Sequence, residues 1–147
     1  MLTKKRRTMK PHYELIEHTA DVGVKAYGKS IADCFSCAAK GMFDIITDSS
    51  NIEEKGEYTL KLKSEDLEQL LVDFLSELLF LHSSRNLVFG FFDVSIDQDK
   101  VELSASIKGE SFDLTKHQYG VEIKAVTYHM LQVHNESPLF VQVLFDI

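Results

Sequence analysis

Residues 139–147 read LFVQVLFDI, an apolar run with one acidic residue, Asp146, next to its end. In a strand, successive side chains point to opposite faces of the sheet. One face would carry Val141, Val143, Phe145 and Ile147, and the other Phe140, Gln142, Leu144 and Asp146. Both faces are too apolar for an exposed edge, so this stretch predicts an interior strand. Asp146 would then lie at the rim where that strand ends.

The end of the chain concentrates negative charge. The Asp146 side chain is one residue from the terminal carboxylate of Ile147, and two such groups repel each other unless a cation or hydrogen-bond donors intervene. The simpler interpretation is that Asp146 is only solvated, because chain ends commonly fray. Spacing alone leaves both interpretations open.

A second acidic position stands near the start of the chain. Residues 16–23 read IEHTADVG and separate two strand-like segments, YELIE at 13–17 and VGVKAYG at 22–28. Asp is depleted from strands and favoured in turns, because its carboxylate bonds to nearby backbone N–H groups. The pattern therefore predicts either a turn or a ligand position at Asp21. The choice depends on what else in the folded chain lies beside this residue.

Two segments have the apolar spacing of amphipathic helices. The first is predicted to begin at Ser30 as N-cap, with Asp33 three residues later. The second is predicted to begin at Ser64, followed by Glu65 and Asp66 in the first turn, where the helix dipole favours acids. The apolar residues are Ile31, Cys34, Phe35, Ala38, Met42 and Phe43 in the first helix and Leu67, Leu70, Leu71, Phe74, Leu78 and Leu79 in the second. Each helix therefore has one face to bury.

Most of the remaining chain is predicted to form strands. Alternation indicates a strand at 56–63, a hairpin from 86–96 and 101–110, and a second hairpin from 122–133 and 139–147. Hairpins combined with helices that do not alternate strictly with parallel strands favour the α+β class. We expect a two-layer sandwich, in which two long helices cover one face of a mixed, mostly antiparallel sheet.

Length and composition predict one globular domain. The chain has 147 residues with 44% hydrophobic content, and no apolar run approaches the ~20 residues that span a bilayer. We expect a basic flexible leader at 1–11, a single domain at 12–147, a cytoplasmic location and no membrane association. The leader carries five of the 16 Lys and Arg, while all 23 acidic residues follow it. An acidic body disfavours broad nucleic-acid binding and favours a cationic partner or metal ion.

Common catalytic motifs have no support in this sequence. Cys34 and Cys37 form a C-x-x-C pair, but both lie a turn or more inside the predicted helix rather than at its N-terminus, so we interpret them as core residues. No third cysteine exists to complete a zinc site. The six histidines show no H-x-x-x-H spacing, and no P-loop, G-x-S-x-G or G-x-G-x-x-G motif is present.

Five segments, in chain order, resemble the archease family and span nearly the whole chain after the leader. They are HTADVGVKAYG at 18–28, AAKGMFDIITD at 38–48, LEQLLVDFLSELLFLH at 67–82, GVEIKAVTYHMLQV at 120–133 and VLFDI at 143–147. The most specific landmarks are HTAD, IKAVTYH and the penultimate Asp. Phe74 stands where a Trp is often found in the family, which concerns packing rather than the site.

The resemblance implies a function as a cofactor and not as an enzyme. Archeases are small cytoplasmic proteins that assist the RtcB-type RNA-splicing ligase. The resemblance implies that this chain promotes the GTP-dependent guanylylation and multiple turnover of such a ligase in tRNA splicing and RNA repair. The ligase contact would be transient, and RNA would be reached only through the ligase.

The resemblance also implies a divalent metal site. Its ligands would be Asp21 of HTAD together with Asp146 and Ile147, the last through backbone or terminal oxygens. Ca²⁺ is the first expectation, with Mg²⁺ and Mn²⁺ as alternatives, since carboxylate and carbonyl oxygens are hard ligands that suit all three. On this interpretation the HTAD turn directs Asp21 to the rim where 139–147 ends.

Other residues of the motifs have both a functional and a structural interpretation. They are His18, Thr19, Lys124, Tyr128 and His129. The structural interpretation is that His18 and Thr19 fix the turn, while Lys124 and Tyr128 share one face of a strand. Two alternative functions also stay open. One is a metal-dependent phosphoester hydrolase that uses Asp21, Asp146 and a histidine base, and the other is an RNA chaperone acting through the basic leader.

Overall fold

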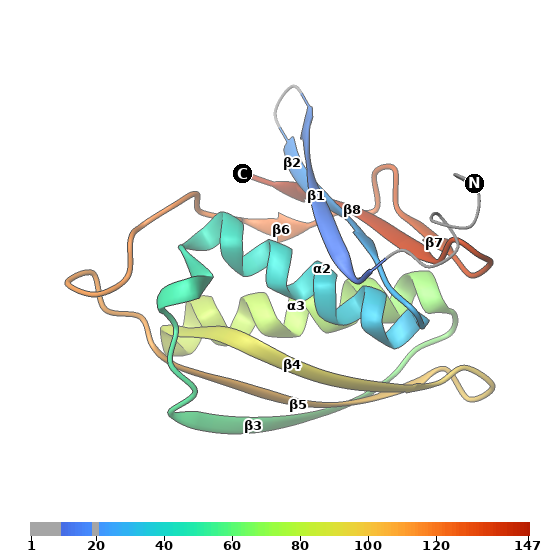
Figure 1. Ribbon diagram of the computed structural model, residues 1–147, viewed down its shortest axis with the longest axis horizontal. Coiled ribbons are helices and arrows are strands. Elements are labelled where there is room, and N and C mark those ends of the chain that lie inside the picture. Colours follow the sequence, from blue (N-terminus) through green and yellow to red (C-terminus); the bar gives the residue numbers. More distant parts are fainter. Residues whose placement is uncertain (1–9, 19–20) are drawn as a thin grey trace.

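The computed structural model describes residues 10–18 and 21–147, which form two antiparallel sheets and two long helices (Figure 1). The predicted α+β class is confirmed. Most of the predicted leader, residues 1–9, lies outside the described residues, as do Thr19 and Ala20 of the HTAD motif. The division into a leader and one domain therefore stays a prediction.

The five-stranded sheet is organised around its last strand. It contains β1 (His12–His18), β2 (Asp21–Tyr27), β8 (Phe140–Asp146) and β6 (Ala125–Val126) in this order, and β7 (Gln132–His134) also pairs with β8. β8 is therefore paired on both of its edges, as its apolar sequence predicts. Hydrogen bonding on both edges fixes where the end of the chain lies.

The three-stranded sheet has the order β3 (Gly56–Lys63), β5 (Glu102–Ser111) and β4 (Leu87–Asp97). The predicted strand at 56–63 and the predicted hairpin across residues 97–100 are both confirmed. Alternate residues of β3 are half-buried and exposed, so one face of this sheet is covered and the other faces solvent.

The helix α2 (Ile31–Ile46) begins where its sequence predicts. Ser30 is the N-cap, and its side chain accepts a hydrogen bond from the Asp33 N–H at 3.1 Å. This bond satisfies one of the amide groups that have no partner within the helix. A short 3-10 helix, η1 (Ser49–Asn51), follows α2.

The helix α3 (Leu67–Arg85) begins later than predicted. Its N-cap is Asp66, whose carboxylate accepts from the Gln69 N–H at 2.8 Å, so the prediction of Ser64 as the start was wrong. The Ser64 hydroxyl instead donates to Asp73 Oδ2 at 2.6 Å, from outside the helix. A carboxylate is an effective acceptor for the first amides of a helix, so Asp66 caps the helix in place of Ser64. α3 ends at Asn86, which adopts the left-handed conformation at φ 58°.

The structure has three layers, one more than the expected two-layer sandwich. The strands divide into two sheets, and α2 and α3 lie between them (Figure 1). Each sheet has one apolar face to bury, and both faces pack on the same helix layer. Buried side chains accordingly come from all three layers, among them Phe35, Phe43, Phe74, Phe89, Val143 and Phe145. No helix in the described part of the chain is both long and apolar enough to cross a bilayer.

The strand expected over 122–133 is divided in two. β6 and β7 are separated by residues 127–131, which form no strand, and Met130 there has a positive φ of 56°. The Tyr128 hydroxyl turns toward α3 and accepts from Gln69 Nε2 at 3.0 Å. Tyr128 and Lys124 therefore do not share a strand face, and that structural interpretation was wrong. A hydrogen bond to a distant helix outweighs the strand propensity of this segment.

The two cysteines occupy the helix α2. Cys34 is fully buried and Cys37 is half-buried against the core. Burial, followed by the charges of Cys37 and Asp33, raises the pKa of Cys34 to about 12. A thiol with so high a pKa is rarely ionised at neutral pH, so the core interpretation is confirmed for Cys34.

Truncation of the central aromatic cluster should be costly. Phe43 is fully buried, and its ring meets Phe89 edge-to-face at 5.6 Å. We expect Phe43→Ala to lower the free energy of unfolding by about 4 kcal/mol, measured by urea denaturation. Phe80→Ala is the matched control, because Phe80 is 56% exposed on the other helix, and its cost should be below about 1 kcal/mol. Similar costs for both variants would contradict this description of the core.

Candidate functional site

The strand register brings the two candidate aspartates together. Asp21, the first residue of β2, lies directly opposite Asp146, the last residue of β8. Residues opposite each other in an antiparallel pair point to the same face, with Cα atoms roughly 4.5–5.5 Å apart. The next row, Val22 and Phe145, packs on the core, so both carboxylates point away from the helices. Asp21 is therefore a strand residue and not part of a turn, while its interpretation as a ligand stays a prediction.

Backbone hydrogen bonds hold the end of the chain against β6. Lys124 donates its N–H to the Asp146 carbonyl at 2.7 Å, and Thr127 donates its N–H and hydroxyl to the Leu144 carbonyl at 3.0 and 2.9 Å. Asp146 is exposed, and Ile147 beyond it is 40% exposed. A segment that is held by hydrogen bonds yet accessible can present its oxygens in a defined direction.

The donor set at this rim suits a hard divalent cation. The candidate ligands Asp21, Asp146 and Ile147 would supply only oxygen, which Ca²⁺, Mg²⁺ and Mn²⁺ prefer. Over residues 10–18 and 21–147, no group of three or more His, Cys, Asp or Glu side chains converges on one point. The set is therefore partial, and water or a partner would have to supply further ligands. The assignment of Asp21, Asp146 and Ile147 as ligands stays a prediction.

The other described residues of the family motifs, Lys124, Tyr128 and His129, lie near the rim but are not among the candidate ligands. Lys124 precedes β6, and Tyr128 is 61% exposed beside α3. The backbone N–H of His129 donates to Thr127 Oγ1 at 3.3 Å, inside the excursion between β6 and β7. The structure describes neither Thr19 nor the side chain of His18, so their predicted roles lie outside the described residues.

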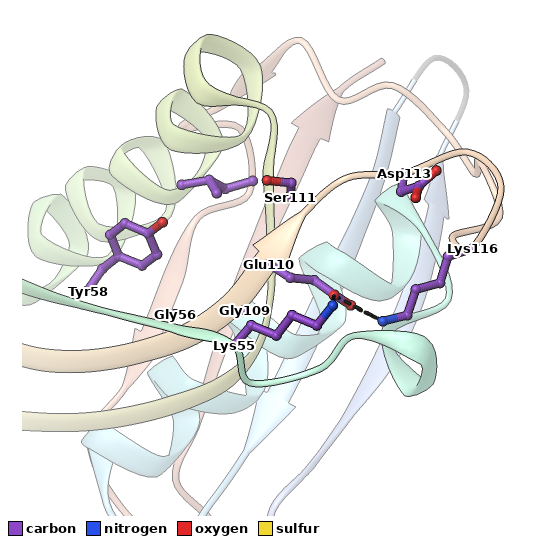
Figure 2. Close-up of a pocket in the computed structure, with 9 residues that line it drawn as sticks. Lys55, Gly56, Tyr58, Gly109, Glu110, Ser111, Asp113 and Lys116 are labelled. Atoms are coloured by element: carbon purple, nitrogen blue, oxygen red, sulfur yellow. Dashed lines mark hydrogen bonds and ion pairs between the residues drawn. The ribbon is translucent and has the colours of Figure 1, made fainter.

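A cluster of charged side chains around the buried Glu110, at the end of β5, was missed from the sequence. Glu110 is only 8% exposed, and Lys116 donates to Glu110 Oε2 at 2.9 Å (Figure 2). Lys55 lies 3.6 Å from Glu110 Oε1, and His117 Nε2 lies 2.9 Å from Glu110 Oε2. The cluster borders a cavity of about 390 Å³ lined by Lys55, Gly56, Tyr58, Leu87, Gly109, Glu110, Ser111, Asp113 and Lys116. No spacing in the sequence links these residues, so no sequence signal could have found them.

The hydrogen bonds of His117 fix its tautomer. The Asp113 N–H donates to His117 Nδ1 at 2.9 Å, so Nε2 carries the proton and donates to Glu110. The ring is 1% exposed and stacks on Phe112 with centroids 5.6 Å apart. Both ring nitrogens of His117 are therefore engaged in hydrogen bonds within the protein. They hold the segment that follows β5 against Glu110, which is a structural role.

Burial raises the pKa of Glu110, but the hydrogen bonds that its carboxylate accepts lower the pKa by more. Hydrogen bonds from the Glu53 N–H, Lys116 and His117 lower the pKa of Glu110 from 4.5 to about 2. A carboxylate whose pKa is lower in the folded state stabilises the fold above its unfolded pKa, and this stabilisation is lost as pH falls. The window of loss is therefore pH 4.5 to about 2.

Neutralising Glu110 should test this cluster. We expect Glu110→Gln to lower the free energy of unfolding by about 3 kcal/mol at pH 7, because it removes the buried anion that Lys116 and Lys55 contact and weakens the acceptor for the His117 N–H. The difference from wild type should shrink as pH falls through the window above, in urea titrations at several pH values. Glu102→Gln on the same strand is the control: its exposed pair with Lys63 should contribute less than about 1 kcal/mol. A pH-independent difference would contradict the ion-pair explanation.

Comparison with known proteins identifies the same family by its family model and by individual relatives. The model of the archease protein family (MTH1598/TM1083) matches residues 13–147. The chain is 43% identical over 123 residues to the protein archease of Pyrococcus furiosus, covering 82% of this chain and 87% of that protein. It is 39% identical over 136 residues to the protein archease of Sulfolobus acidocaldarius, covering 92% and 98%.

A solved structure shares the fold. The solution structure of Methanobacterium thermoautotrophicum protein 1598 superposes with a TM-score of 0.78 at 36% identity, covering 92% of this chain and 98% of that one. The matched range, residues 13–147, spans both strands that carry Asp21 and Asp146. The chain therefore belongs to the archease family.

Proposed function

We propose that this protein is a non-catalytic cofactor that activates an RtcB-type RNA ligase. It would promote the GTP-dependent guanylylation of the ligase and its multiple turnover in tRNA splicing and RNA repair. Family membership supports a role as cofactor of an RNA-processing ligase. The observation that carries the proposal is the cross-strand pair of Asp21 and Asp146 beside the terminus, since it forms an accessible all-oxygen rim.

The rim would act through its negative charge. Asp21, Asp146 and the Ile147 carboxylate would hold a divalent cation, Ca²⁺ first and Mg²⁺ or Mn²⁺ as alternatives, which neutralises phosphate charge when bound. The carboxylates bind and orient, and the Lys124 N–H keeps the Asp146 backbone in place. Because a partial ligand set leaves positions for a partner's groups, the rim suits a transient complex with the ligase.

Charge would also guide the encounter. All 23 acidic residues of the chain follow residue 10, so the folded body is complementary to a basic RNA-binding groove on a ligase. Complementary charge accelerates association and weakens with added salt. The acidic surface thereby favours rapid binding and release, which a cofactor needs in order to serve many ligase molecules.

Loss of either rim aspartate should abolish activation. We expect Asp146→Asn and Asp21→Asn each to reduce the acceleration of ligase guanylylation at least tenfold, because each removes one hard ligand and one negative charge. Radiolabelled GTP and substoichiometric amounts of this protein provide the assay, and Ca²⁺ calorimetry on the protein alone reports the ligand role. Asp99→Asn, in the exposed β4–β5 turn, is the control and should activate like wild type. Full activation by Asp146→Asn would rule out the rim mechanism.

Blocking the terminus should have a similar effect. A six-residue extension after Ile147 moves the terminal carboxylate away from the rim, whereas the same extension before Met1 leaves it in place. We expect the first to lower ligase activation several-fold and the second to leave it unchanged, with both proteins unfolding at the wild-type temperature. Equal activation by the two would remove the terminus from the ligand set. Phosphoester turnover without any ligase would favour the hydrolase alternative.

A further inference from the structure

The strand β3 is paired on only one of its two edges. It pairs with β5 over all eight of its residues, and within the described part of the chain no strand pairs with its other edge. In Figure 1 β3 forms the lower border of the molecule. A free edge presents a row of unpaired N–H and C=O groups, so it can accept a further strand.

The register with β5 shows which backbone groups of β3 point to the free edge. Directly after the strand, the Ser64 N–H donates to the Val101 carbonyl at 3.1 Å, which continues the register of Lys63 with Glu102. Along an antiparallel strand, successive residues direct their N–H and C=O groups to alternate sides. The even-numbered residues of β3 therefore bond to β5, and the odd-numbered residues point outward. The outward residues are Glu57, Thr59, Lys61 and Lys63.

The side chains of β3 form an apolar row on one face and a charged row on the other. The apolar row is half-buried and packs against the core, and it consists of Tyr58, Leu60 and Leu62. The odd-numbered side chains are exposed. Lys63 lies 3.4 Å from Glu102 Oε2, but both side chains of this pair remain well exposed. The charged row is therefore accessible to a partner strand.

We propose that β3 is a self-association surface, which pairs antiparallel with β3 of a second copy of this chain about a two-fold axis at Leu60. In this register Leu60 faces Leu60 of the second copy, and Tyr58 faces Leu62 of the second copy. These are the non-hydrogen-bonded positions of the new strand pair, where facing side chains come closest. The apolar row thus continues across the interface, and two three-stranded sheets become one six-stranded sheet.

Charge complementarity favours a second copy as the occupant. In the same register Glu57 of each copy stands opposite Lys63 of the other, so the two-fold axis creates two pairs of opposite charge. Thr59 stands opposite Lys61, and these outward residues supply the new backbone hydrogen bonds. Lysines on an edge strand discourage pairing with most other strands, but β3 itself carries the acid that matches them.

Two other edge strands fit a second copy less well. The register of β4 shifts between Phe89 and Phe91, and such an irregularity twists an edge away from regular pairing. The strand β1 carries Glu14 and Glu17 but no lysine or arginine, so two copies of β1 would bring together only negative charge. Of these three edges, β3 alone combines a regular strand with complementary charges.

The proposed dimer would be weak and would leave the rim accessible. A single pair of edge strands buries less surface than the roughly 1,200 Å² of a stable interface, so we expect a dissociation constant of about 10–100 µM. The rim belongs to the five-stranded sheet, on the other side of the helix layer from β3 (Figure 1). The proposal does not rest on activation of a ligase, and its tests contain no ligase.

Exchange of the interface charges should test the register. We expect Glu57→Lys and Lys63→Glu each to weaken self-association at least about tenfold, because like charges would then face each other twice. An equimolar mixture of the two variants should form a heterodimer with about wild-type affinity, because each variant supplies the charge that the other lacks. Sedimentation velocity and native mass spectrometry of the full chain measure both effects.

A matched control separates the register from net charge. Asp93→Lys changes the net charge by the same amount as Glu57→Lys, also at an exposed position, but on β4. Its self-association should equal that of wild type. Thermal unfolding of each variant should occur near the wild-type temperature, since all the exchanged charges are exposed.

Backbone amide exchange gives a readout that needs no variant. Between about 10 and 500 µM wild-type protein, the Thr59 and Lys61 N–H groups should exchange more slowly as the dimer forms, because they gain hydrogen bonds across the interface. The Leu60 N–H between them already bonds to β5, and its exchange should stay unchanged. NMR spectra recorded at several concentrations would show this alternation.

Three outcomes would overturn the proposal. They are a wild-type protein that stays monomeric at about 500 µM, self-association that Glu57→Lys does not weaken, and a mixture of the two charge variants that forms no heterodimer. Rescue in the mixture, wild-type behaviour of Asp93→Lys and slowed exchange at Thr59 and Lys61 would support it.

Discussion

The register between β2 and β8 is the constraint on which the rest of the structure depends. With Val24 opposite Val143 and Ala26 opposite Val141, the apolar side chains of both strands face the helices. A slip of one residue would turn every one of these side chains to solvent, so the core fixes the register firmly. The same register necessarily sets Asp21 against Asp146 at one end and Tyr27 against Phe140 at the other.

Close backbone contact reinforces this register. A Cβ atom on Gly23 would lie 2.2 Å from the Val143 carbonyl oxygen and 2.5 Å from Leu144 Cδ2, so no larger residue fits there. The Leu144 side chain occupies the space over Gly23, and it is fully buried although it points away from the helices. An apolar residue thus separates the acidic rim from the polar and aromatic end of the same face.

The segment from β5 to β6 shows how distant parts of the chain support the rim. The pairing of His117 with Glu110 fixes the start of this segment, and Gly120 and Val121 donate their N–H groups to the carbonyls of Ile46 and Ile45 at 2.8 and 2.9 Å. Lys124 then donates to Asp146 at the rim. The rim is therefore tied through one continuous segment to α2 and to the three-stranded sheet. Buried, fully paired polar groups are suited to such positioning, because any alternative placement leaves a charge without a partner.

The sequence by itself determined what depends on local periodicity and on family motifs. It predicted α2 with its Ser30 cap, the strand at 56–63, the interior position of 139–147 and the location of Asp146 at a rim, because each follows from neighbours a few residues apart. Only the tertiary structure decided the rest. The second sheet, the division of the strand after residue 122 and the contacts of Lys55 with Glu110 and of Tyr128 with Gln69 all arise from residues that are remote in the chain. Their partners are selected by burial and hydrogen bonding across layers, which no local pattern records.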